Sequence, residues 1–266
     1  MWRVGKTRIF FPTLSVTSYH WEEILEIKGH LALVTGGGRR IGAACVRALS
    51  AAGVRVAVHC HGSTELAENL CREIHAAGGA AWTVAADLSD GRAVEALLPR
   101  VEKNGGPVTI LVNNAAMFEP DTVLGANWDD WNRHMALNLA APFFLMSRFA
   151  RQVPEGAMGK VINIIDQRVL RPGKGYVSYT VAKSGLLSLT RMAALEFAPK
   201  IQVNAIGPGA ILPAAGDDTE TFMQLSRSVP MGRPGSTDDI TEALLFFLRQ
   251  DYITGEMLCV DGGQHL

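Results

Sequence analysis

The chain has 266 residues, is 48% hydrophobic and carries a formal net charge of −1 at pH 7. This is enough apolar material for one domain with a large core. The sequence has no apolar run of the roughly 18 residues that a membrane helix needs, and no basic stripe that would indicate a nucleic-acid partner. The four cysteines are scattered without a CxxC pair. This is typical of reduced thiols, so we expect a cytoplasmic protein with no metal site.

Residues 1–28 differ in composition from the rest. Met1–His20 contains three basic residues, several Ser and Thr, and no acid, which faintly resembles a transit peptide. We prefer two simpler explanations, a short extension outside the core or a start codon assigned too far upstream. We therefore treat 1–28 as an N-terminal extension and expect one folded domain over 29–266.

From His30 onwards, short apolar runs alternate with stretches of helical periodicity. The expected strands are His30–Thr35, Val54–Cys60, Ala81–Ala86, Val108–Asn113, Lys160–Asp166, Ile201–Ile206 and Glu256–Val260. The expected helices are Ile41–Ala52, Thr64–Ala77, Ser89–Lys103 with Ser89 as N-cap, Trp128–Gln152, Tyr176–Ala198 and Asp238–Arg249. Gly207–Arg233, rich in Pro and Gly, is expected to be a loop with short helices. The alternation predicts an α/β protein with a doubly wound parallel sheet, a Rossmann fold of order 3-2-1-4-5-6 with a seventh strand.

A glycine-rich turn, Gly36–Gly42, follows the first expected strand and opens the first helix. Such a turn lets the backbone approach a pyrophosphate, which binds at the helix N-terminus, although Gly37 and Gly38 could simply form a tight turn. The placement directly after a buried strand favours the phosphate site. The predicted cofactor contacts in this turn are Gly36, Arg39, Arg40, Ile41 and Gly42.

The end of the second expected strand indicates which dinucleotide binds. NAD-binding proteins usually place an acidic residue there for the ribose 2′-hydroxyl, but this chain reads HCHGST with no acid before Glu65. Arg39, His61, Ser63 and Thr64 can surround a 2′-phosphate instead. We therefore predict NADPH, with His59, His61 and Ser63 among its contacts.

Tyr179 and Lys183 lie four residues apart, on one face of an expected helix. An ammonium beside a phenol favours the phenolate, which would make Tyr179 an acid/base near neutral pH. Asp166, thirteen residues before Tyr179, ends the fifth expected strand.

This Tyr-x-x-x-Lys pair, together with the motifs TGGGRRIG, NNAA, LNLAA, GPG and DGG in the same order along residues 29–266, resembles the short-chain dehydrogenase/reductase family. The resemblance implies a homotetramer built on helices Trp128–Gln152 and Tyr176–Ala198. It implies that Asn138 holds a water beside Lys183, which in turn holds the nicotinamide ribose. The further cofactor contacts that it implies are Asp87, Leu88, Asn114, Ala115, Tyr179, Lys183, Pro208 and Gly209.

Asp166 departs from the family, most of whose members have a serine at this position. A carboxylate about 4 Å from a developing oxyanion would oppose it by roughly 4 kcal/mol at an effective dielectric constant near 20. In the reduction of a C=N bond the carboxylate has the opposite effect. The nitrogen gains a proton and becomes positive, and a carboxylate stabilises that charge.

Within the family, this pattern resembles pteridine reductases, which share Asp166, Arg40, the pair His59 and His61, and Phe118. The resemblance implies that the pterin stacks on Phe118 and contacts Arg40, Asp166 and Tyr179. Two departures concern substrate and cofactor contacts: Gly62 stands where these enzymes often have Arg, and Ala116-Met117 replaces small polar residues.

The predicted function is therefore NADPH-dependent reduction of a dihydropterin or dihydrofolate, with Tyr179 delivering the proton. A carbonyl reductase of the 3-oxoacyl-carrier-protein type, with Asp166 as a tolerated substitution, is one alternative. A non-catalytic NADPH-binding protein is the other.

Overall fold

The computed structural model describes residues 27–62, 64–213 and 219–266. Its centre is a seven-stranded parallel sheet in the order β3-β2-β1-β4-β5-β6-β7, which confirms the predicted topology. The order reverses between β1 and β4, where such sheets open a crevice at the carboxyl ends of the strands. The strands are β1 (Leu31–Val34), β2 (Arg55–Cys60), β3 (Ala81–Ala85), β4 (Ile110–Asn113), β5 (Gly159–Ile164), β6 (Ile201–Pro208) and β7 (Met257–Val260).

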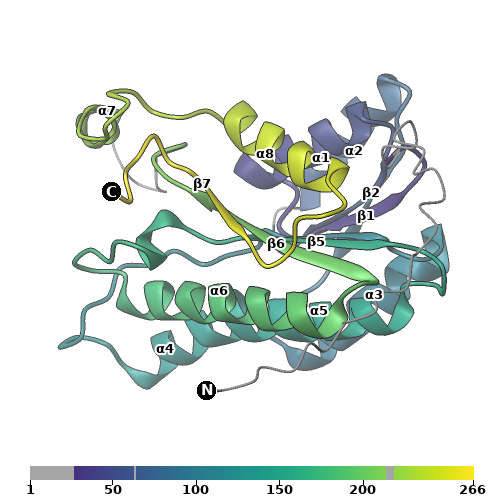
Figure 1. Cartoon of the computed structure of the whole chain (residues 1–266), viewed down its shortest axis with the longest axis horizontal. Coiled ribbons are helices and arrows are strands. Elements are labelled where there is room, and N and C mark those ends of the chain that lie inside the picture. The colour runs from purple at the N-terminus through teal and green to yellow at the C-terminus, as the bar shows by residue number, and fades with distance from the viewer. Residues whose placement is uncertain (1–26, 63, 214–218) are drawn as a thin grey trace, which may run out of the picture.

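Helices cover both faces of the sheet (Figure 1). One face carries α1 (Arg40–Ala51), α2 (Thr64–Ala76) and α8 (Thr237–Arg249), and the other carries α3 (Gly91–Gly105), α4 (Trp128–Met135), α5 (Ala141–Gln152) and α6 (Val177–Phe197). No helix in these described stretches is long and apolar enough to cross a membrane.

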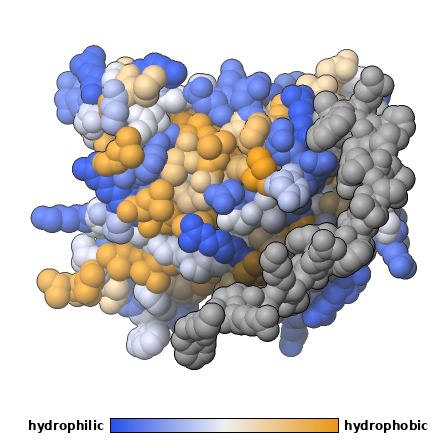
Figure 2. Space-filling view, in the orientation of Figure 1, coloured by the Kyte–Doolittle hydropathy of each residue, from blue (hydrophilic) through white to orange (hydrophobic). Residues whose placement is uncertain are grey.

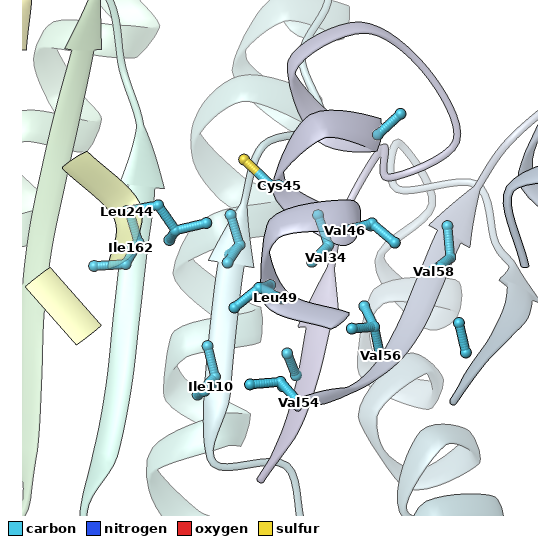
Figure 3. Close-up of a cluster of buried hydrophobic side chains, with 14 of the residues drawn as sticks. Val34, Cys45, Val46, Leu49, Val54, Val56, Val58, Ile110, Ile162 and Leu244 are labelled. Carbon is cyan, nitrogen blue, oxygen red and sulfur yellow. The ribbon is translucent and has the colours of Figure 1, made fainter. Parts of the chain in front are cut away.

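Two apolar clusters hold these layers together, one on each face of the sheet. In β1, Ala32 and Val34 belong to the cluster beneath α1 and α8, whereas Leu31 and Leu33 belong to the opposite one. Figure 3 shows Val34 meeting Val46 and Leu49 of α1 in the first cluster. A strand buried on both faces must be apolar at every position, and the four residues of β1 are all buried.

The predicted helix Trp128–Gln152 contains a π-helical turn, η1 (Ala136–Ala140), between α4 and α5. Pro142 has no N–H to donate in the α-helical register, and the N–H of Ala141 donates to the carbonyl of Ala136, five residues back. Asn138 lies in this widened turn.

The third helix begins two residues later than expected, and the prediction of Ser89 as its N-cap was wrong. Asp90 is the N-cap, and its carboxylate accepts the N–H of Arg92. Ser89 is already engaged with Asp87, to which its hydroxyl donates over 2.7 Å.

In the predicted loop Gly207–Arg233, β6 extends to Pro208 and a short helix, α7 (Thr219–Arg227), follows. Residues 214–218 lie outside the described part of the chain, as do residues 1–26 of the expected extension. Ile27, at the start of the described part, is buried in the cluster beneath α1 and α8.

Candidate active site

The structure brings the three predicted catalytic residues together where β5 ends against α6. The Tyr179 hydroxyl donates to Asp166 Oδ2 over 3.0 Å. Lys183 Nζ donates to the carbonyl oxygen of Ile164 over 2.7 Å and lies 5.8 Å from the centre of the Tyr179 ring. Tyr179 and Lys183 are both buried, so these contacts form away from bulk water.

The pKa of Tyr179 differs from the sequence prediction. Burial raises it well above the ordinary value, and the charge and hydrogen bond of Asp166 raise it further. The prediction that Lys183 lowers it was wrong for the protein alone, because Lys183 donates to a backbone carbonyl while Asp166 is the hydrogen-bond partner of the phenol. Tyr179 is therefore a neutral phenol, a proton donor rather than a base.

Burial also shifts the two charged partners toward their neutral forms. It raises the pKa of Asp166, which the hydrogen bonds from Arg168 N–H and Tyr179 and the charges of Arg168 and Lys183 partly offset. It lowers the pKa of Lys183 to about 8. Tyr179 and Asp166 share a 3.0 Å hydrogen bond along which a proton can pass between them.

Asn138, the fourth predicted catalytic residue, is fully buried and holds the loop after β4. Its side chain accepts the N–H of Met117 and donates to the carbonyl of Met117, both over 2.9 Å. Its amide also lies 3.1 Å from Nδ1 of His134, a buried residue that the sequence analysis did not single out. These bonds position the residue that follows, Phe118. A water held beside Lys183 stays a prediction.

The glycine-rich turn is shaped as a phosphate site requires. Gly36 has a φ of +60°, and a Cβ on Gly42 would lie 2.2 Å from the Gly36 carbonyl oxygen, so glycine is needed at both positions. Behind the turn, Asn114 Nδ2 donates to the carbonyls of Thr35 and Gly36. The N–H groups of Asn114 and Ala115 both donate to Thr35 Oγ1. Asn114 and Ala115 thus brace the turn.

The α1 N-terminus is open to an anion. Arg39 is its N-cap but makes no side-chain capping bond, and the first turn contains no acidic residue, so backbone N–H groups remain for a ligand. This fits the pyrophosphate of a dinucleotide. Arg40, with a φ of +54°, donates from Nη2 to the Pro213 carbonyl over 2.6 Å, which links the turn to the loop after β6. Ile41 is half-buried in the first turn of α1.

His59 is buried and holds the phosphate turn from behind. Its Nδ1 accepts the N–H of Gly36 over 3.0 Å, and its Nε2 lies 3.0 Å from the carbonyl of Ala86. Accepting at Nδ1 and donating at Nε2 defines a neutral imidazole, and burial lowers the pKa of His59. His59 is thus placed to support the turn. His61 is exposed, 3.8 Å from Asp87, and Ser63 lies outside the described residues.

The remaining predicted contacts lie at the edges of the site. The Leu88 side chain is buried in the cluster beneath α3 and α5, so only its backbone can face a ligand, while Asp87 is partly exposed. Pro208 ends β6. At Gly209, a Cβ would come within 2.5 Å of Asp261, so the chain can pass there only as glycine.

Phe118, the predicted stacking ring, is 37% exposed and lies beside Tyr179. The two rings meet edge to face, with centroids 4.7 Å apart. One face of Phe118 is covered by Tyr176, parallel to within 5° at 4.0 Å. The Arg168 guanidinium carbon lies 5.2 Å from the Tyr176 centroid and 5.9 Å from that of Phe118. A pterin would therefore stack on the other face of Phe118 or displace Tyr176.

Arg168 and Tyr176 were missed because neither matches a motif. The signal available in the sequence is the segment QRVLRPGKGY between Asp166 and Tyr179, which carries three cations and an aromatic residue but no acid. Its proximity to the predicted catalytic pair could have drawn attention to it.

One group of potential metal ligands occurs in the stretches that the structure describes: Cys259, Asp261 and His265. The carboxylate of Asp261 accepts the N–H groups of Gly263 and His265 and contacts the His265 ring at 2.7 Å. These bonds hold the turn that follows β7, at the predicted DGG motif.

A family model described as enoyl-(acyl carrier protein) reductase matches residues 37–265. Two relatives are similar along nearly the whole chain. The 3beta-hydroxysteroid dehydrogenase 1 of Eggerthella lenta is 33% identical over 91% of this chain and 95% of that protein. The 3-oxoacyl-[acyl-carrier-protein] reductase FabG of Staphylococcus aureus is 31% identical over 88% of this chain and 98% of that protein.

Several solved structures are also similar to this chain along most of its length. FolM alternative dihydrofolate reductase 1 from Brucella canis, complexed with NADP, has a TM-score of 0.87 at 38% identity, covering 90% of this chain and 95% of that one. A blue fluorescent protein from a metagenomic library, in complex with NADPH, has a TM-score of 0.84 at 33% identity, covering 90% and 99%. The short-chain dehydrogenase/reductase from Serratia marcescens has a TM-score of 0.85 at 31% identity, covering 91% and 100%. With its topology, its Tyr179–Lys183 pair and relatives of this similarity, the chain belongs to the short-chain dehydrogenase/reductase family of oxidoreductases.

Proposed function

We propose that this oxidoreductase uses NADPH to reduce a C=N bond of a pteridine, such as a dihydropterin or dihydrofolate. The observation that carries the proposal is the 3.0 Å hydrogen bond from Tyr179 to Asp166 in a buried site. A carboxylate in that position suits a reacting nitrogen that becomes positive and opposes an oxygen that becomes negative. The likeness to the Brucella canis dihydrofolate reductase supports the same substrate class.

Three features of the cofactor site support NADPH. The α1 N-terminus has no side-chain capping bond and no acid in its first turn, the end of β2 carries no acidic residue, and the exposed side chains of Arg39 and His61 lie nearby in sequence. The Brucella canis structure and the metagenomic protein were solved with NADP and NADPH.

The mechanism assigns each proton to an atom. Bound NADPH supplies the hydride to the carbon of the C=N bond. Tyr179 holds the proton for the nitrogen on its hydroxyl, as its raised pKa requires. Asp166, whose pKa is also raised, can take up a proton from the solvent side and return it to Tyr179 along their hydrogen bond. The positive charge of Lys183 favours the ionised form of Asp166.

The test is to assay a panel of substrates and to measure the rate of NADPH consumption with each. Turnover of dihydrobiopterin, dihydromonapterin or dihydrofolate at rates well above that of an acetoacetyl thioester supports the proposal. Faster turnover of the acetoacetyl thioester would favour the second candidate function, a carbonyl reductase. The similarity to the Staphylococcus aureus 3-oxoacyl-[acyl-carrier-protein] reductase supports that candidate. Cofactor binding without turnover on any substrate would indicate a non-catalytic NADPH-binding protein.

His59 offers a test of the cofactor site. His59→Leu removes the acceptor for the Gly36 N–H, so we expect the KM for NADPH to rise about tenfold, the cost of one unsatisfied buried donor. His59→Gln, which can offer an amide acceptor to Gly36, should recover part of the loss. Because burial lowers the pKa of His59, its ring stays neutral at neutral and alkaline pH, so the ratio of the NADPH KM of His59→Leu to that of the unmodified enzyme should not change with pH there. A His59→Leu enzyme with unchanged NADPH kinetics would contradict the bracing role.

A homotetramer is part of the proposal. Apolar side chains lie among polar ones across the face shown in Figure 2, and several on α5 and α6 are exposed: Phe143, Phe144, Val181, Met192 and Leu195. Burying such residues between subunits would remove them from water. We expect light scattering to give four times the chain mass of 28.7 kDa, and Leu195→Glu to lower that mass. A monomer for the unmodified chain would contradict it.

A further inference from the structure

Arg168 lies beside the rings of Phe118 and Tyr176. Its charge acts on Asp166, but its guanidinium forms no ion pair with an acidic side chain of the described residues. Arg168 belongs to a short 3-10 turn, η2 (Gln167–Val169), and its backbone N–H donates to Asp166 Oδ1 over 2.8 Å. The other oxygen of Asp166 accepts the Tyr179 hydroxyl. The two carboxylate oxygens are thus occupied by other donors, and the guanidinium forms no ion pair or hydrogen bond with any described residue.

The surroundings hold this guanidinium in a defined place. It is half-buried, and it lies against the parallel rings of Tyr176 and Phe118 at 5.2 and 5.9 Å. Aromatic faces attract a guanidinium but leave its in-plane N–H donors unused. A Cβ at Gly173 would come within 3.1 Å of Arg168 Nη1, so the absence of a side chain there leaves room beside those donors.

Acidic residues of the neighbouring loop are engaged elsewhere. Asp121 accepts the N–H and hydroxyl of Ser178, and Glu119 pairs with Arg133 at 2.8 Å. The segment from Gln167 to Tyr176 itself contains no acid. Within the described residues, this edge of the site therefore presents a guanidinium with no ion pair beside an aromatic surface.

Tyr176 is in a costly conformation that keeps its ring in this cluster. Its φ is +57°, in the left-handed region that non-glycine residues rarely adopt, at the residue that caps α6. Such backbone strain persists where the surrounding structure requires it, and it clusters at ligand-binding sites.

We propose that Arg168, held against Tyr176 and Phe118, binds an anionic group on the side chain of the pteridine, either a carboxylate or a phosphate ester. The inference rests on the proposed function and narrows its substrate class to pteridines that carry a negative charge beyond the ring system. The planar, fixed guanidinium suits either anion, because both accept paired N–H bonds.

The test compares substrates that differ by the anion alone. For the phosphate, 7,8-dihydroneopterin and its 3′-phosphate are assayed with NADPH; for the carboxylate, dihydrofolate is compared with its dimethyl ester, which keeps the side chain and loses its charge. For each pair, the ratio of kcat/KM on the anionic substrate to kcat/KM on the neutral one is measured. In Arg168→Met we expect this ratio to fall about tenfold or more for the kind of anion that Arg168 binds, because one charge-assisted hydrogen bond is lost. Arg168→Lys, which keeps the charge but not the planar fork, should give an intermediate ratio.

Arg151→Met is the matched control, because it removes an exposed guanidinium from the last turn of α5. It should leave both ratios at the unmodified values. An Arg168→Met enzyme that loses activity equally on neutral and anionic substrates would overturn the inference, since Arg168 would then serve only to offset the charge of Asp166. Absence of turnover on all four pteridines by the unmodified enzyme would instead reject the proposed function.

Discussion

Replacing Asp166 with serine is expected to move the enzyme from pteridine toward carbonyl substrates. The carboxylate would no longer stabilise a protonated nitrogen, and Tyr179 would lose the charged acceptor of its hydrogen bond. We expect kcat/KM for a dihydropterin to fall by up to about 1,000-fold, since a charge interaction of roughly 4 kcal/mol is removed. Activity on acetoacetyl thioesters should rise, because the same interaction opposes a developing oxyanion.

Asp166→Asn separates charge from geometry. The amide oxygen can still accept the Tyr179 hydroxyl, so a variant that fails on pteridines as badly as Asp166→Ser indicates that the charge matters. Asp90→Ser is the control, because it removes an exposed carboxylate and leaves a residue that can cap α3. An Asp166→Ser enzyme that retains full pteridine activity would falsify the proposed role of the carboxylate.

The sheet order could be predicted because it depends on regular features of the sequence. Each strand is a short apolar run and each connection contains a helix, so right-handed crossovers leave few arrangements. The π-helical turn could not be predicted in the same way. It follows from Pro142 only once the register of the neighbouring helices is known.

The site was predicted in part, and the limits have physical causes. Spacing places Tyr179 above Lys183 on α6 and Asp166 at the end of β5, since these are local relationships. Spacing does not report burial, and burial reverses the expected shift in the pKa of Tyr179. It also does not show that Leu88 is buried in the core or that His59 supports the turn from behind.

Arg168 and Tyr176, which belong to no motif, could not be predicted as site residues either. Their positions depend on a left-handed residue at the start of α6 and on a 3-10 turn after Asp166. Neither feature follows from residue types. A stack between Phe118 and Tyr176, which lie 58 positions apart, requires the folded loops.

Lys183→Met is expected to abolish catalysis and yet stabilise the fold at neutral pH. Burial lowers the pKa of Lys183 from 10.5 to about 8, so the folded state pays for a charged ammonium at any pH below 8. A pKa shift of this size means that the buried ammonium destabilises the folded state by about 3 kcal/mol, which the variant removes. The variant also loses the hydrogen bond to the Ile164 carbonyl, which costs about 1 to 2 kcal/mol. We therefore expect a gain of about 1 to 2 kcal/mol in the free energy of unfolding at pH 7, measured in urea.

The stability advantage of Lys183→Met should depend on pH. Between pH 8 and 10.5 the unfolded chain binds a proton at Lys183 that the folded chain has released, so the unmodified protein gains stability as pH rises through this window. Lys183→Met lacks that gain, and its advantage should shrink steadily above pH 8. Lys103→Met, at an exposed position near the end of α3, should change stability by less than about 0.5 kcal/mol at either pH. If Lys183→Met is less stable than the unmodified protein at pH 7, the ammonium is better compensated than burial implies, and the charge of Asp166 must supply the difference across the buried site.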